Sequence, residues 1–124
     1  MSQKDRLIIG ITGASGVIYG IRFLQMLKAT PIETHLILSK AAERTIAYET
    51  DFKIRDIKEM ADVVHDNSDI GASIASGSFR ARGMVIAPCS MKSLAEVANG
   101  VADNLIARAA DVMLKERRRL VLMA

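Results

Sequence analysis

Two segments rich in glycine and hydroxyl side chains are the parts of this chain best suited to hold an anionic ligand. The first is Thr12-Gly13-Ala14-Ser15-Gly16, and the second is Pro88-Cys89-Ser90-Met91-Lys92-Ser93; each follows a short apolar run. Glycine lets a backbone approach a ligand closely, and a helix start offers free N–H groups and the positive end of a dipole to a phosphate. Two such loops facing one crevice would suit a mononucleotide.

Each segment also has a purely structural interpretation. The first could be a tight turn between a strand and a helix, with Ser15 capping the helix. Ser90 could likewise be an ordinary helix cap. Cys89 has no histidine near it in the sequence, and we expect it to be a small buried side chain. On the residues alone these alternatives stay open.

Charged side chains supply further candidates. Arg108 and Lys115 are seven residues apart, two turns along one face of a predicted helix, so both could reach one anion. The basic run 117–119 at the end of that helix is expected to be solvated and to offset the helix dipole. Glu49 closes another predicted helix, where a surface carboxylate is the default.

The elements that must position these residues alternate along the chain. Apolar runs predict strands at residues 7–12, 34–39, 84–87 and 120–123. Helical spacing predicts helices at 17–28, 40–49, 56–64, about 94–98 and 104–117. This alternation predicts an α/β fold, a three-layer Rossmann-like or flavodoxin-like parallel sheet with helices on both faces. The two glycine- and hydroxyl-rich segments would then follow the carboxyl ends of strands.

Composition narrows the class of partner. The net charge of +3, from 17 basic and 14 acidic residues, suits an anionic small molecule as well as nucleic acid. The absence of Trp and the scarcity of other aromatic residues argue against the stacking platforms that bind single-stranded nucleic acid. His35 and His65 lie in no ligand-like cluster, and no metal site is expected.

The cellular location is predicted to be the cytoplasm. A single cysteine excludes an intramolecular disulfide and a multi-cysteine zinc site. The uncharged stretch 7–21 is too rich in glycine and hydroxyl side chains for a signal peptide. It is also shorter than the roughly 20 apolar residues that a membrane span needs, so no membrane partner is expected.

The first segment also resembles the nucleotide loop of short-chain dehydrogenases. Those enzymes need a Tyr-x-x-x-Lys pair, and neither Tyr19 nor Tyr48 is followed four residues later by Lys. This interpretation is therefore excluded.

Several segments taken together resemble the flavin prenyltransferase (UbiX) family, in order and over nearly the whole chain. They are residues 10–16 with Tyr19-Gly20, then 39–42, 49–51, 76–79, 84–90 and 108–118. The wider relatives, flavin-containing cysteine decarboxylases, share the motif at 99–105. They typically carry Ala-Asn-Thr where this chain has Met91-Lys92-Ser93, so they match less well.

The resemblance implies a single flavin-binding α/β domain over residues 1–124. Family members transfer the dimethylallyl group of dimethylallyl phosphate to reduced FMN, and a UbiD-type decarboxylase uses the prenylated FMN as its cofactor. They assemble as homo-oligomers. The alternatives are a non-catalytic FMN-binding protein and a cysteine decarboxylase-like enzyme.

The resemblance also implies roles for individual residues. Glu49 and Ser15 would be catalytic, and Arg108 with Lys115 would bind the substrate phosphate in place of a metal. In the family, the strand at 120–123 continues into further site residues and a closing helix, so we expect a chain ending at Ala124 to keep part of the FMN site and to be catalytically crippled. By motif match, the FMN contacts would be Gly13, Ala14, Ser15, Ser39, Ser90, Met91, Lys92 and Ser93.

Overall fold

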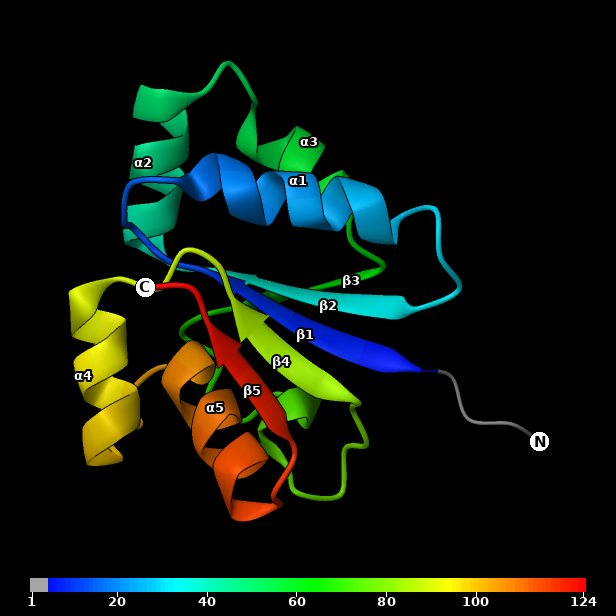
Figure 1. Ribbon diagram of the computed structural model, residues 1–124, viewed down its shortest axis with the longest axis vertical. Coiled ribbons are helices and arrows are strands. Elements are labelled where there is room, and N and C mark those ends of the chain that lie inside the picture. The colour runs from blue at the N-terminus through cyan, green and yellow to red at the C-terminus, as the bar shows by residue number, and fades with distance from the viewer. Residues whose placement is uncertain (1–4) are drawn as a thin grey trace.

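A computed structural model describes residues 5–124 and has the predicted three-layer α/β architecture (Figure 1). Five parallel strands form one sheet in the order β3-β2-β1-β4-β5. The strands are β1 (Arg6–Ile11), β2 (Glu33–Leu38), β3 (Val63–Asp66), β4 (Gly83–Ile86) and β5 (Arg119–Leu122). The helices are α1 (Val17–Leu27), α2 (Lys40–Glu49), α3 (Ile54–Glu59), α4 (Met91–Asn99) and α5 (Leu105–Lys115), with a 3-10 turn η1 (Ser73–Ala75).

Helices cover both faces of the sheet, which is why its central strands are apolar on both sides. Figure 1 shows α1, α2 and α3 on one side and α4 and α5 on the other. In β1, Ile9 and Ile11 belong to the core shared with α1, whereas Ile8 belongs to the core shared with α5. No helix within residues 5–124 is long and apolar enough to cross a membrane.

The order of the strands reverses beside β1. From β1 the chain proceeds outward to β2 and β3, then returns to place β4 on the other side of β1. The loops that follow β1 and β4 therefore leave neighbouring strands at the same edge of the sheet. Open α/β sheets bind ligands at such a reversal, outside the carboxyl ends of the strands.

Two details of the predicted elements are corrected. The helix predicted at 56–64 is wrong beyond residue 59, because Val63 and Val64 belong to β3, paired with β2. β-Branched residues favour a strand once a partner strand is available. The four predicted strands also begin and end one residue earlier than expected, so Thr12 and Ser39 already lie in the loops that follow β1 and β2.

Candidate functional site

The loop between β1 and α1 packs closely on the start of α2. A Cβ placed on Gly13 would lie 2.5 Å from the Cβ of Ala41 and 2.9 Å from its carbonyl carbon, so only glycine fits. Gly16 takes a left-handed conformation (φ 97°) as the N-cap of α1, which has no side-chain capping hydrogen bond. The alternative that Ser15 caps α1 is therefore wrong, and Ser15 is exposed.

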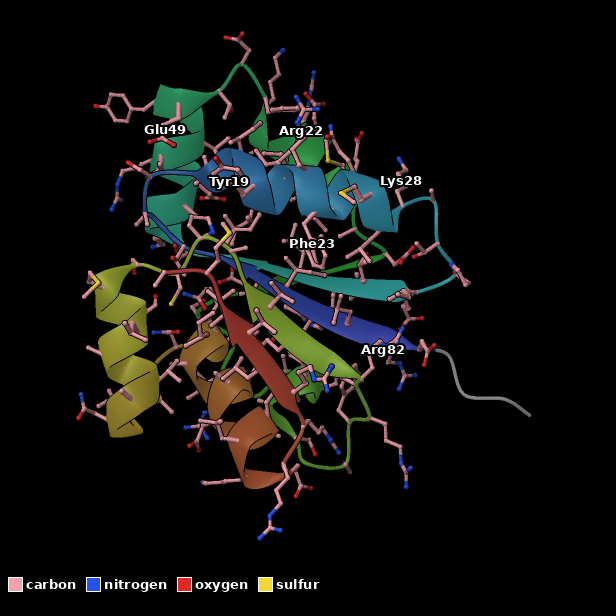
Figure 2. All side chains as sticks on the ribbon, in the orientation of Figure 1. Tyr19, Arg22, Phe23, Lys28, Glu49 and Arg82 are labelled. Carbon is pink, nitrogen blue, oxygen red and sulfur yellow. The ribbon has the colours of Figure 1, made fainter. Side chains whose placement is uncertain are left out.

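Glu49 lies beside this loop, although 33 residues separate it from Gly16. Its Oε1 accepts a hydrogen bond of 3.1 Å from the Gly16 N–H. Figure 2 shows Glu49 at the C-terminal end of α2, near the start of α1 where Tyr19 lies. The resemblance singled out Glu49, and the fold brings its carboxylate to the first loop.

Three capped helix starts lie at the carboxyl edge of the sheet. Ser39 Oγ accepts from the Ala42 N–H at 3.0 Å at the start of α2. Ser90 Oγ accepts from the Ser93 N–H at 3.1 Å at the start of α4. Asn104 caps α5 in the same way. Ser90 is thus the ordinary cap that one interpretation expected, and its helix start still faces the ligand-sized cavity described next.

A cavity of about 570 Å³ joins these helix starts. This volume is within the range of small-molecule sites. Five of the eight predicted FMN contacts line the cavity: Gly13, Ser39, Ser90, Lys92 and Ser93. The two segments that the sequence singled out therefore share one cavity. The other three predicted contacts, Ala14, Ser15 and Met91, do not line it.

The side-chain charges around the cavity balance. Three cations and three carboxylates line it, namely Lys40, Arg44, Lys92, Asp66, Glu96 and Asp103. Hydrogen bonds from the hydroxyl and N–H of Ser68 lower the pKa of Asp66. An anion bound here would thus be held by the oriented N–H groups and dipoles of the helix starts rather than by net side-chain charge.

Thr12 belongs to the first predicted segment, but no role was predicted for it. Thr12 Oγ1 donates to the Pro88 carbonyl at 2.7 Å and accepts from the Ser90 N–H at 2.8 Å. These bonds link the first predicted loop to the second. A threonine at a strand end is a weak signal, because its partners lie more than 70 residues away.

Arg108 and Lys115 do not meet at the cavity in this chain. Arg108 Nη2 donates to the Ala102 carbonyl at 3.5 Å, and its Nε is buried without a hydrogen-bond partner among the described residues. Lys115 is exposed at the other end of α5 and forms an ion pair of 2.9 Å with Asp111. Their binding of a substrate phosphate stays a prediction.

The three arginines of the basic run 117–119 differ in exposure. Arg117 and Arg119 are exposed, as expected. Arg118 is half-buried instead: it donates to the carbonyls of Phe79 (2.6 Å) and Gly77 (2.8 Å), because the connection 66–83 folds back over it. Arg118 therefore anchors that connection.

The two histidines, which had no assigned role, are neighbours in the fold. His35 Nδ1 lies 2.9 Å from His65 Nε2, and His35 Nε2 lies 2.8 Å from Glu33 Oε1. The hydrogen bond with His35 lowers the pKa of Glu33, and burial lowers the pKa of His65. Pairing of β2 with β3 creates this cluster, so it was not visible in the sequence.

Cys89 is buried, as expected, with 3% of its surface exposed. Burial raises the pKa of its thiol. Within the described part of the chain, no group of three or more His, Cys, Asp or Glu residues is placed to hold a metal ion.

Comparison with known proteins connects this geometry to flavin proteins. The chain is 61% identical to the flavin prenyltransferase UbiX of Thauera aromatica over 118 residues, which are 95% of this chain and 61% of that protein. It matches a crystal structure of AnUbiX (PadA1) in complex with FMN and dimethylallyl pyrophosphate, with a TM-score of 0.97 and 52% identity over 98% of this chain and 65% of the other. It also matches a dodecameric FMN-dependent UbiX-like decarboxylase from Escherichia coli O157:H7, with a TM-score of 0.93 and 52% identity over 94% of this chain and 64% of the other.

The chain thus spans less than two thirds of the length of these relatives. The sequence model of the Flavoprotein family matches residues 1–124. Together with the cavity between the two loops, this match identifies the chain as a member of the Flavoprotein family.

Proposed function

We propose that residues 1–124 form one flavin-binding domain of a flavin prenyltransferase, an enzyme that transfers a dimethylallyl group from dimethylallyl phosphate to reduced FMN. The observation that carries this proposal is the cavity of about 570 Å³ at which both predicted loops and three helix starts meet. The 61% identity to the Thauera aromatica flavin prenyltransferase supports the same reaction.

The residues around the cavity fit FMN. The starts of α2 and α4 offer N–H groups to its phosphate, with Lys92 beside them. The missing side chain of Gly13 leaves the first loop against α2, at the cavity wall. Ala14, Ser15 and Met91 are proposed to contact the flavin from the flanking loops. When bound, reduced FMN supplies the nucleophilic N5 and C6 atoms to which the prenyl group is joined.

Glu49 and Ser15 are proposed to be catalytic. The Glu49 carboxylate is already held at the first loop by the Gly16 N–H, so it can stabilise positive charge or accept a proton near the prenyl group. Ser15, in the same loop, would offer a hydroxyl donor. Arg108 and Lys115 would hold the departing phosphate, and the buried Nε of Arg108 supports an acceptor at that position.

A direct assay tests the reaction. The protein is incubated without oxygen with reduced FMN and dimethylallyl phosphate, and prenylated FMN is sought by mass spectrometry. Wild type should bind FMN, and Glu49→Gln should also bind FMN but form much less product than wild type does. Lack of FMN binding by wild type would contradict the proposal. FMN binding without product would indicate a non-catalytic flavin-binding protein, and release of carbon dioxide from a peptidyl cysteine would indicate a cysteine decarboxylase.

The proposal extends to assembly and location. We expect a homo-oligomer in the cytoplasm that passes prenylated FMN to a UbiD-type decarboxylase. Large apolar side chains exposed on the chain, Tyr19, Met26, Tyr48 and Met91, support burial against further copies. Light scattering after gel filtration measures the assembly, and a monomer at micromolar concentration would contradict it.

A further inference from the structure

Thr12 connects the end of β1 to the first turn of α4. It is only 2% exposed. Its Oγ1 donates to the Pro88 carbonyl at 2.7 Å and accepts from the Ser90 N–H at 2.8 Å. The Thr12 N–H also donates to the Pro88 carbonyl, at 3.3 Å. With one bond donated and one accepted, this hydroxyl is largely committed to the protein and is poorly placed to act as a ligand group itself.

The backbone donors that follow β4 show why a side chain is needed here. The backbone bonding between β1 and β4 reaches the Ala87 N–H, which donates to the Gly10 carbonyl at 2.9 Å. Pro88 has no N–H to donate, and the Cys89 N–H donates to the Met123 carbonyl at 2.7 Å. The Ser90 N–H, which comes next, donates to the Thr12 hydroxyl. Without that acceptor, a partly buried N–H would lack a partner.

The same strand end also holds the start of α2. The Ser39 N–H donates to the Ile11 carbonyl at 3.1 Å, and Ser39 then caps α2. Two consecutive residues, Ile11 at the end of β1 and Thr12 directly after it, therefore fix two helix starts: α2 through a backbone carbonyl and α4 through a hydroxyl. Both helix starts line the cavity. Their separation decides whether their N–H groups converge on one bound anion.

We infer that Thr12 is a positioning residue that sets the start of α4 relative to the start of α2 and thereby the affinity for FMN, an inference that rests on the proposed function. Thr12 lines the cavity, but its hydroxyl acts through Ser90, because both of its hydrogen bonds are made within the protein. Replacing it by valine keeps the shape and removes both hydroxyl bonds. Replacing it by serine keeps the hydroxyl.

A matched control exists elsewhere in the sheet. Thr34 is also 2% exposed, and its Oγ1 likewise donates once and accepts once, to Asp62 Oδ2 (3.2 Å) and from the Asp62 N–H (3.0 Å). It lies near the amino end of β2, outside the FMN cavity. Thr34→Val therefore loses the same number of buried hydrogen bonds without touching the two helix starts.

The dissociation constant of FMN is measured by quenching of flavin fluorescence, together with the visible spectrum of the bound flavin, for wild type, Thr12→Val, Thr12→Ser and Thr34→Val. Thr12→Val should weaken FMN binding about tenfold, since an unpaired amide is left and the anion site loses its alignment. Thr12→Ser and Thr34→Val should bind within about twofold of wild type, because neither loses the contact to Ser90. Equal losses in Thr12→Val and Thr34→Val, or no loss in Thr12→Val, would overturn the inference.

Amide hydrogen exchange in unliganded wild type gives a second measurement, which does not depend on a variant that folds. The Ser90 amide should be protected from exchange. Exchange at the rate of exposed loop amides would refute the hydrogen bond from the Ser90 N–H to Thr12. If wild type binds no FMN, the proposed function is refuted. A protected Ser90 amide would still establish the Thr12 contact in that case, so the two failures are distinguishable.

Discussion

Gly13 gives the sharpest test of how the first loop is built. A Cβ at this position would lie 2.5 Å from the Ala41 Cβ, 2.9 Å from the Ala41 carbonyl carbon and 3.1 Å from its carbonyl oxygen. Ordinary contacts of a Cβ begin at 3.4 Å. Gly13→Ala must therefore move the loop away from α2 by roughly 1 Å, because two of the three opposing atoms belong to backbone and cannot rotate aside.

The size of the effect follows from that displacement. Overpacking of this kind lowers the free energy of unfolding by about 1–3 kcal/mol. A displacement near 1 Å at a site that depends on orientation can weaken function up to about a hundredfold. We therefore expect Gly13→Ala to raise the dissociation constant of FMN by roughly tenfold to a hundredfold. Fluorescence titration measures this constant, and urea denaturation measures the stability.

Two further variants isolate the cause. Gly71→Ala is the control, since the nearest atom to a Cβ there is Asp69 Oδ1 at 3.9 Å and Gly71 does not have the positive φ that disfavours alanine. Ala41→Gly in the Gly13→Ala background removes the closest contact but leaves the backbone ones, so it should restore only part of the affinity. A double-mutant cycle reports this coupling. Wild-type affinity in Gly13→Ala, or no coupling to Ala41, would refute the packing argument.

Three further predictions concern stability and reactivity. Because burial lowers the pKa of His65 below its usual 6.5, against a smaller opposing effect of Asp69, the unfolded chain takes up that proton at a higher pH than the native protein does. The contribution of His65 to the free energy of unfolding is then fully present above about pH 6.5 and is lost as the pH decreases toward the native pKa. His65→Gln should flatten this pH dependence in denaturant titrations. An unaltered slope would count against the assignment. The thiol of Cys89, buried and with a raised pKa, should react with a thiol reagent at pH 8 far more slowly in native than in urea-unfolded protein; similar rates would show that it is accessible. Lys115→Met should change the free energy of unfolding by less than about 0.5 kcal/mol, because the ion pair with Asp111 is solvent-exposed, and should leave FMN affinity unaltered; a tenfold weaker affinity would place Lys115 at the flavin.

Local sequence signals predicted much of the fold. Four of the five strands were found within one residue, because short, mainly apolar runs are typical of parallel strands. The first two residues of β3 were assigned to a helix because β3 is a short strand of four residues with alternating burial. Its conformation depends on the hydrogen bonds that β2 supplies.

The candidate site was predicted to a similar extent. Gly13, Ser39 and Ser90 were placed correctly at the cavity, since their roles in turns and caps depend on near neighbours in the chain. The expectation that Arg108 and Lys115 bind one phosphate came from their spacing along one helix, and it stays a prediction. Of that helix, only the start lies beside the cavity.

The sequence by itself determined the kinds of elements, the two loops and the family that they resemble, because propensity, apolar periodicity and glycine act over a few residues. Only the tertiary structure decided which distant groups touch. Thr12 meets Ser90 across 78 residues, His35 meets His65 across 30, and Glu49 meets Gly16 across 33. Each contact exists because the arrangement of strands and helices brings two separate segments within hydrogen-bonding distance, and that arrangement is not encoded by any one segment.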